Sequence, residues 1–292
     1  MKEPDWRKIE LETSALSIRT TGFLGEGWTS RAYLVNNELV FRFPKRAEDW
    51  LELEREIAFL AIASTNLSLG VPDYLRAAPE STAAPYGYAV YRYLSGRALE
   101  LNALSRRKRD AAADLLATFL LELHHLHPTS ELNSLLPRED PRLVAEDYLI
   151  QAERQIAPKL QLSDAKALRD QFETYLGSAN NFRFKPSVTH ADLGRDHILV
   201  EDDAIVGVID FGDVSWGDPD YDFMYLFIDF GLEFVGEVAR RYGHPDLENL
   251  ASKLLYFAIV DQIGTILEGP GRALEGQQET AWRRLLEFLR MQ

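Results

Sequence analysis

The residues with the clearest chemical potential lie in two short segments of the C-terminal half of the chain. The first is His190-Ala191-Asp192, with His197 five positions after the aspartate, and the second is Asp210-Phe211-Gly212. Transfer of a phosphoryl group needs a carboxylate that positions the acceptor hydroxyl group, and oxygen-rich ligands that hold Mg²⁺ against the phosphates. Asp192 and Asp210 could supply these functions, so phosphoryl transfer is the first hypothesis.

The order and spacing of these segments match the two signatures of a kinase catalytic site, H-x-D-x-x-x-x-N and, downstream, D-F-G. Asp192 stands at the position of the base, and His197 stands where the metal-binding asparagine is usual. An isolated H-x-D triplet would be weak evidence. Two signatures in the right order and at a plausible separation are strong evidence for a kinase site.

A glycine-containing turn lies upstream, between predicted strands at 17–24 and 31–35. Gly25 and Gly27 would let backbone amides close over phosphates, and Ser30 stands where a third glycine is typical. An ordinary hairpin turn would have a similar composition. The phosphate-binding interpretation therefore depends on the kinase signatures downstream.

A kinase site also needs a cation on a strand near the phosphates and a helix glutamate that pairs with it. The predicted strand at 39–45 offers two cations, Arg42 and Lys45. The charged segment that follows offers Glu56 and, one helical turn earlier, Glu52. Both choices are open on the residues alone.

Hydrophobic patterns predict a β-rich lobe over residues 1–95 and a helical lobe over 99–292, with a hinge at about 91–98. In the first lobe, Asn36-Asn37 is typical of a hairpin turn. This lobe is predicted to contain strands at 17–24, 31–35, 38–43 and 86–94 and a helix at 46–63. The second lobe is predicted to contain helices at about 111–126, 141–157, 164–176 and from 221 onwards, with a hairpin of 197–201 and 204–210.

Composition limits the partners that the protein can have. The chain has 292 residues and a net charge of −14, with 46 acidic and 32 basic residues. Nucleic acids and anionic membranes repel such a surface, so we expect neither as a partner. The absence of cysteine excludes disulfides and thiol catalysis and fits a reducing cytoplasm. No secretion signal and no apolar run of about 20 residues is visible.

On these motifs the chain resembles the aminoglycoside phosphotransferase family of small-molecule kinases, with details similar to its 2″-phosphotransferase and macrolide phosphotransferase branches. The resemblance covers roughly residues 22–223. It implies an α+β, protein-kinase-like fold, with a small N-terminal antiparallel sheet lobe and a larger helical C-terminal lobe. It implies that Asp192 is the catalytic base and that His197 and Asp210 bind Mg²⁺. It further implies that Asp222 braces the catalytic loop.

The same resemblance assigns the donor nucleotide site. It places Arg42 at the position of the phosphate-binding lysine and Glu56 at that of its partner. Backbone groups near Tyr93 and Leu94 would contact the edge of the base, with Tyr91 at the gatekeeper position. A bulky gatekeeper accompanies the use of GTP in the 2″-branch, so the expected donor is ATP or GTP.

Negative charge is concentrated around the kinase signatures. Between His190 and Glu233 there are twelve acidic residues and one basic residue. Such a neighbourhood suits a small cationic substrate, although the general acidity of the chain explains it equally well. The helices after Phe223 should form the acceptor wall and also carry apolar residues that would suit a macrolide. The candidate substrate contacts are Asp213, Asp229, Glu233 and Asp261.

The sequence therefore predicts a cytoplasmic, monomeric kinase that transfers the γ-phosphoryl group of ATP or GTP, with Mg²⁺, to a hydroxyl group of an aminoglycoside antibiotic and so confers resistance. A macrolide kinase or a metabolite kinase is the alternative within the same fold. A pseudokinase, which binds nucleotide without catalysis, is the alternative from another class. Arg42 and His197 motivate it, because they depart from the common kinase residues.

Overall fold

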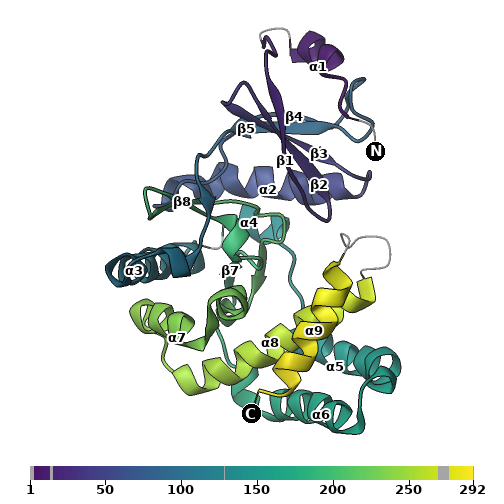
Figure 1. Cartoon of the computed structure of the whole chain (residues 1–292), viewed down its shortest axis with the longest axis vertical. Helices are drawn as coiled ribbons and strands as arrows, with labels where there is room; N and C mark the ends of the chain where they lie inside the picture. Colours follow the sequence, from purple (N-terminus) through teal and green to yellow (C-terminus); the bar gives the residue numbers. More distant parts are fainter. Residues whose placement is uncertain (1–2, 14–15, 128, 269–275, 292) are drawn as a thin grey trace.

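The computed structural model describes residues 3–13, 16–127, 129–268 and 276–291, which form a sheet lobe and a helical lobe (Figure 1). The sheet lobe is a five-stranded antiparallel sheet with strand order β1-β2-β3-β5-β4, so β3 lies at its centre. The strands are β1 (Thr21–Glu26), β2 (Ser30–Val35), β3 (Leu39–Pro44), β4 (Tyr74–Ala78) and β5 (Tyr88–Arg92). The predicted fold class, α+β with an N-terminal sheet lobe, is confirmed.

The predicted hairpin between β2 and β3 is confirmed. Asn36 and Asn37 have φ angles of 55° and 58°, the left-handed conformation that a two-residue hairpin turn requires. Leu39 pairs with Val35 directly after the turn. The turn therefore fixes the register of β3, the strand that carries Arg42.

The sequence prediction lacks two elements of this lobe. Helix α1 (Trp6–Thr13) packs on the sheet through Trp6, whose ring lies edge-on at 5.4 to 5.9 Å from three aromatic rings of β2 and β3. Strand β4 forms one edge of the sheet and contains a bulge after Tyr74. The predicted helix of this lobe is α2 (Asp49–Ala63), which lies between the sheet and the helical lobe (Figure 1).

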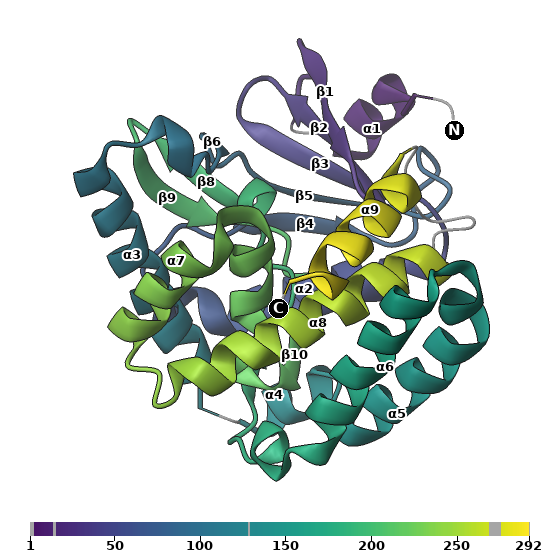
Figure 2. The same ribbon diagram turned by 60° about the horizontal axis from the view of Figure 1, so that its bottom comes forward.

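The helical lobe surrounds two small sheets. Strand β7 pairs with β10, and β6 pairs with the predicted hairpin of β8 and β9. Figure 2 shows α8 between α7 on one side and α5 and α6 on the other, with α9 along it. The helices are α3 (Arg106–His124), α4 (Ser130–Leu135), α5 (Pro141–Gln151), α6 (Leu162–Gly177), α7 (Met224–Tyr242), α8 (Leu247–Glu268) and α9 (Gln277–Leu289). The strands are β6 (Arg97–Ala98), β7 (Ser187–Thr189), β8 (Ile198–Glu201), β9 (Ala204–Val208) and β10 (Ser215–Gly217).

Two helices differ from their predicted form. The helix predicted over 141–157 leaves α-helical geometry after Gln151 and continues as a π-helical segment to Ile156. Helix α7 contains a kink at Gly231, which has φ 81° and ψ 170°. Glycine is the residue that tolerates this backbone conformation, and the kink redirects the second half of α7.

Helix α8 has the length and hydropathy of a membrane span over Leu247–Leu267, with a mean hydropathy of 1.4. This differs from the expectation that no apolar run approaches that length. However, 56% of the segment is buried inside the protein. Leu254, Ile259 and Ile263 are fully buried there, as in the core helix of a soluble protein.

The ring of Phe211, within the D-F-G segment, joins α2 to the helical lobe. It is fully buried and lies 5.7 Å from the ring of Phe59 in α2 and 6.5 Å from that of Phe119 in α3. Its ring is also 4.5 Å from the imidazole of His190. The packing of one aromatic side chain therefore fixes Asp210 relative to the catalytic loop and to α2.

We expect Phe211→Ala to lower the free energy of unfolding by about 3–5 kcal/mol, because it leaves a cavity in a fully buried site. Phe211→Leu, which retains much of the volume, should cost less. Phe23→Ala is the control, because the Phe23 side chain is 58% exposed. Urea denaturation measures all three, and a loss with Phe211→Ala no larger than that with Phe23→Ala would contradict the packing argument.

Candidate active site

The catalytic loop after β7 is held by a carboxylate from a later segment. Asp222 accepts hydrogen bonds from the backbone N–H groups of His190, at 3.0 Å, and Ala191, at 2.8 Å. Ala191 has a φ of 65°, which is uncommon for a residue with a side chain and must be held by its surroundings. Asp222 therefore braces the loop, as the resemblance implies.

The imidazole of His190 links the two kinase signatures. Burial lowers its pKa to about 4, so the ring is neutral at pH 7. The amide of Asp192 donates to its Nδ1 at 3.2 Å, and its Nε2–H donates to the carbonyl of Ile209 at 3.2 Å. Since Ile209 precedes Asp210 in the chain, the ring holds both aspartate-bearing segments in register.

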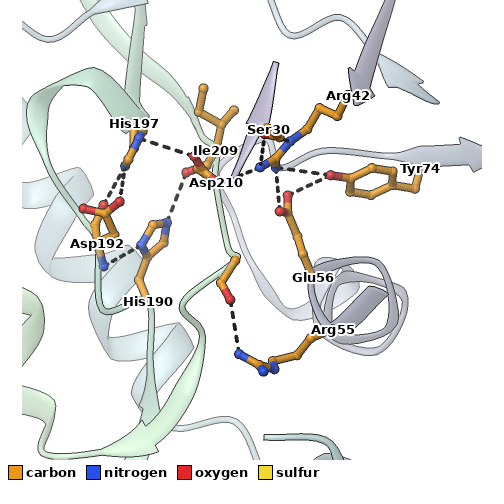
Figure 3. A network of polar contacts seen from close by, with 11 residues as sticks. Ser30, Arg42, Arg55, Glu56, Tyr74, His190, Asp192, His197, Ile209 and Asp210 are labelled. Atoms are coloured by element: carbon orange, nitrogen blue, oxygen red, sulfur yellow. Dashed lines mark hydrogen bonds and ion pairs between the residues drawn. The ribbon is translucent and has the colours of Figure 1, made fainter. Parts of the chain in front are cut away.

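His197 lies between the carboxylates of Asp192 and Asp210 (Figure 3). Its Nδ1 donates to the backbone carbonyl of Asp192 at 2.7 Å, and its Nε2 is 3.6 Å from a carboxylate oxygen of Asp210. Burial opposes a charged ring, but the two carboxylates raise the pKa of His197 above its ordinary value. Burial and neighbouring carboxylates raise the pKa of Asp192 well above its usual range. Although burial opposes it, the cations of Arg42 and His197 lower the pKa of Asp210.

The guanidinium of Arg42 bridges the two lobes (Figure 3). Its Nη1 is 2.6 Å from the carboxylate of Glu56 in α2, and its Nη2 is 3.0 Å from that of Asp210. The hydroxyl of Ser30 accepts a further N–H at 3.1 Å, and the hydroxyl of Tyr74 donates to Glu56 at 2.9 Å. Glu56 is fully buried and Arg42 nearly so. The structure thus forms the arginine–glutamate pair that the resemblance implies.

The glycine-containing segment lies differently from the prediction. Gly25 belongs to β1, and the turn spans residues 27–30, closed by a hydrogen bond of 2.9 Å from the amide of Gly27 to the carbonyl of Ser30. Lys45 contacts this turn rather than Glu56, with its Nζ 3.0 Å from the carbonyl oxygen of Gly27. A Cβ atom added at Gly25 would meet no atom within 4 Å, so packing does not require glycine there. The space beside the strand is open to a ligand.

The predicted hinge follows β5. Tyr91 is buried, and its ring lies edge-on at 5.2 Å from that of Tyr74. The amide of Tyr93 donates to the carbonyl of Glu38 at 2.8 Å, so a base contact of Tyr93 would use its carbonyl group and stays a prediction. Leu94 has no backbone hydrogen bond to another described residue, so a base-contacting role for Leu94 stays a prediction.

Three of the four predicted acceptor residues adjoin the catalytic centre. Asp229 accepts the N–H of Arg195, in the catalytic loop, at 2.8 Å, and Asp261 accepts the hydroxyl of Tyr225 at 2.6 Å. Burial raises the pKa of Asp261 to about 6. Burial likewise raises the pKa of Asp213 and that of Asp229. Burial therefore disfavours the ionised forms of these three carboxylates, and a bound cation would favour them.

Glu233, the fourth predicted acceptor residue, stays a prediction as a substrate contact. It lies exposed on α7, beyond the kink at Gly231.

Sequence reasoning missed three side chains that hold the site. Tyr74 contacts Glu56, Tyr225 contacts Asp261, and Nη2 of Arg284 lies 4.0 Å from Asp229. Each comes from an element distant in sequence from its partner. Neither spacing nor composition signals such contacts.

His197 and Asp210 offer two adjoining ligand atoms for a metal ion. Because Nδ1 of His197 donates to a carbonyl, the neutral ring carries its lone pair at Nε2, which faces Asp210. Within the described ranges, no group of three histidine, aspartate or glutamate side chains forms a metal site. Two protein ligands nevertheless fit Mg²⁺, which commonly keeps several waters and binds substrate phosphates.

Comparison with known proteins supports a kinase-like site. The model of the phosphotransferase enzyme family matches residues 20–254. The chain is similar to the GDP complex of wild-type aminoglycoside 2'-phosphotransferase-IIIa, with a TM-score of 0.90 and 29% identity over 97% of each chain. It is also similar to the GDP and kanamycin complex of APH(2")-IIia, with a TM-score of 0.89 and 30% identity over 97% of each chain. Macrolide 2'-phosphotransferase type I shares the fold, with a TM-score of 0.74 and 20% identity over 96% of this chain and 95% of that one.

The raised pKa of Asp261, about 6, makes a prediction about stability. In the unfolded chain this carboxyl titrates near 3.9, so between about pH 4 and pH 6 the folded state increasingly bears an unfavourable buried charge. Asp261→Asn should match the wild type near pH 4 and become more stable than it above pH 6, by up to about 3 kcal/mol. Urea denaturation between pH 4.5 and 8 measures the difference.

Asp196→Asn is the control for this pH series, because the Asp196 side chain is 80% exposed. It should show no comparable dependence on pH. A wild type that is more stable than Asp261→Asn at pH 8 would show that the carboxylate is stabilised by its surroundings instead.

Proposed function

The chain belongs to the phosphotransferase enzyme family, and from this premise we propose that it transfers the γ-phosphoryl group of ATP or GTP to a hydroxyl group of an aminoglycoside antibiotic, and so confers resistance. The observation that carries the proposal is a continuous chain of polar contacts (Figure 3). It starts at Glu56 and passes through Arg42 to Asp210. From there it continues through His197 to Asp192 in the catalytic loop.

In this proposal the sheet lobe binds the donor nucleotide. Arg42 contacts the phosphates, and Glu56 fixes the orientation of its guanidinium. Arginine suits this role because its planar fork matches pairs of phosphate oxygens and its charge is permanent. Gly25 and Gly27 leave room for phosphates beside the backbone, and Ser30 holds Arg42 in place.

Asp192 is the catalytic residue of the proposal. It orients the acceptor hydroxyl and accepts its proton as the hydroxyl oxygen attacks the γ-phosphorus. Its raised pKa suits a base, because proton transfer is most effective when the pKa of the base lies nearer the working pH. The amide of Asp192, bonded to His190, and the backbone contacts of Asp222 hold the loop at this position.

Asp210 and His197 would hold Mg²⁺, which would neutralise charge on the phosphates of the donor. The protein's part is to keep the two ligand atoms facing each other. The hydrogen bond from Nδ1 of His197 to the Asp192 carbonyl does this for the imidazole. The ion pair with Arg42 does it for the carboxylate of Asp210.

The acceptor site is acidic, which suits a cationic substrate. Asp213, Asp229 and Asp261 have raised pKa values, so an ammonium group bound among them would favour their ionised forms. Complexes of the similar enzymes contain kanamycin and gentamicin. An aminoglycoside carries several ammonium groups, and it is therefore the acceptor that we infer.

The alternative functions are less well supported. The macrolide enzyme compared above is 20% identical and is similar in fold alone. A pseudokinase is disfavoured because the family is one of phosphotransferases and the Asp192 and Asp210 side chains are both present and brought together through His197. We further infer that the enzyme acts as a monomer in the cytoplasm, which the lack of cysteine fits. Gel filtration with light scattering tests the oligomeric state.

Asp192→Asn should retain nucleotide binding and lower kcat for kanamycin by about 10²–10⁴-fold, because a general base is lost. Asp210→Asn should instead abolish productive binding of the metal–nucleotide complex. His197→Asn should keep activity with Mg²⁺, whereas His197→Ala should raise the Mg²⁺ concentration required. Steady-state kinetics with ATP and GTP in parallel measure these effects. Wild-type turnover by Asp192→Asn would refute the assignment of this loop.

The KM for kanamycin should rise steeply between 0.05 and about 0.5 M NaCl, since several charge contacts are screened over a Debye length of about 10 Å at 0.1 M. Asp229→Asn should raise this KM more than it lowers kcat, as expected for lost ground-state binding. Glu233→Gln is the matched comparison and should change KM less, because Glu233 lies exposed beyond the kink. A KM that does not depend on salt would argue against a polycationic acceptor.

A further inference from the structure

One side-chain contact joins the tip of the glycine-containing turn to the last helix of the chain. The indole Nε1–H of Trp28 donates a hydrogen bond of 2.8 Å to the side-chain oxygen of Gln277. Trp28 lies in the turn between β1 and β2, and Gln277 is the first residue of α9. The two residues are 249 positions apart, and Figure 1 shows the start of α9 beside the sheet lobe. The contact therefore crosses from one lobe to the other.

On the sheet side, the backbone of this turn is tied to β3. The amide of Lys45 donates to the carbonyl of Thr29 at 2.8 Å. Nζ of Lys45 is 3.0 Å from the carbonyl oxygen of Gly27 and 2.8 Å from the carboxylate of Glu26. Because these contacts hold the backbone from the sheet side, the Trp28 indole provides a contact of the turn with the helical lobe.

On the helical side, Gln277 belongs to a firmly packed helix. The side chains of Ala281, Leu285 and Phe288 are buried, and the Phe288 ring lies 5.9 Å from that of Phe227 in α7. The neighbouring side chain of Gln278 donates to the carbonyl of Ile266 in α8 at 3.2 Å. The acceptor of the Trp28 hydrogen bond is therefore fixed relative to the helical lobe.

The same helix also reaches the acceptor wall. Gln277 and Arg284 are seven residues apart, which is about two helical turns, so they lie on the same side of α9 and are separated by about 10 Å along its axis. Nη2 of Arg284 is 4.0 Å from Asp229, and Asp229 accepts the N–H of Arg195 in the catalytic loop. Helix α9 thus contacts the phosphate-side turn at one end and the acceptor wall further along.

We propose that Trp28 and Gln277 form a latch that keeps the glycine-containing turn closed against the helical lobe and so positions the donor nucleotide relative to the acceptor wall. Both are positioning residues, since neither touches the reacting atoms. A turn that contains glycine loses conformational entropy when it is ordered over a ligand. The latch orders it beforehand, so nucleotide binding requires less further ordering. The identity of the acceptor rests on the proposed function, but the latch itself requires only that the protein binds a nucleotide.

The test is a double-mutant cycle of Trp28→Phe and Gln277→Leu, with GDP and ADP as probes in isothermal titration calorimetry. A typical neutral hydrogen bond changes an equilibrium by about fivefold. Loss of the hydrogen bond should shift the equilibrium between the closed and the open turn by this factor. The apparent Kd of the nucleotide then rises by up to about fivefold in each single variant. The double variant should be no weaker than the singles, because both remove the same contact. Gln277→Glu keeps an acceptor oxygen and should bind nucleotide like the wild type.

Hydrogen exchange locates the effect. In the GDP-bound protein, amides of residues 25–30 should exchange faster in both single variants, while the midpoint of thermal unfolding stays within about 2 °C of the wild type. Trp50→Phe repeats the tryptophan change on α2, and Gln151→Leu removes a glutamine contact with Asp147 within α5 of the helical lobe. Neither control should change the nucleotide Kd or the exchange of the turn.

Three outcomes would overturn the latch: unchanged Kd and exchange in both single variants, additive losses in the double variant, or an equal loss in Gln151→Leu. A failure of the proposed function is seen separately. If the wild type bound GDP but did not phosphorylate kanamycin, the acceptor assignment would fall, and the nucleotide titrations would still decide the latch.

Discussion

The two lobes meet at the active site around one buried cation, the guanidinium of Arg42. It stands 2.6 Å from Glu56 and 3.0 Å from Asp210, in surroundings where an unpaired charge is very unfavourable. Removing any one member would leave the others uncompensated, so β3, α2 and the segment Asp210-Phe211-Gly212 must keep their relative positions. Ser30 and Tyr74 occupy further hydrogen-bonding groups of the cluster. Asp210 has a φ of 66°, an uncommon backbone conformation that the ion pair and the buried Phe211 ring hold in place.

Excess negative charge is the second constraint on the site. Burial and mutual repulsion raise the pKa of Asp192 and that of Asp213, whereas the pKa of Asp210 is lowered because Arg42 and His197 face it. The protein therefore supplies positive charge at the donor side and leaves an excess of negative charge at the acceptor side. Cations that enter the acceptor side relieve this repulsion, so the same electrostatic imbalance that destabilises the empty protein contributes to binding.

The sequence is informative where function depends on short, contiguous motifs. The spacing of Asp192, His197 and Asp210 along one loop and one hairpin predicts that these side chains lie together, and the structure brings them into contact. The Asn36-Asn37 hairpin could be predicted because few residues tolerate its backbone conformation. Contacts such as Tyr225 with Asp261 could not, because they depend on which faces of the consecutive helices α7 and α8 pack together. The kink at Gly231 lies between Asp229 and Glu233 in α7, and the helical pattern of the sequence does not reveal it.

The contrast between contiguous motifs and contacts made by packing explains why the sequence defines the chemistry of the protein more sharply than its acceptor. Phosphoryl transfer requires the same few groups at fixed distances whatever hydroxyl is phosphorylated, and those groups lie on the sheet lobe and the catalytic loop. In the function that we propose, recognition of the acceptor depends on α7, α8 and α9, where packing between elements sets the positions of Asp229 and Asp261. Macrolide and aminoglycoside enzymes share this fold, with TM-scores of 0.74 and 0.90 to this chain. Substitutions in these three helices can therefore change the substrate while the buried Arg42 cluster and the transfer chemistry remain the same.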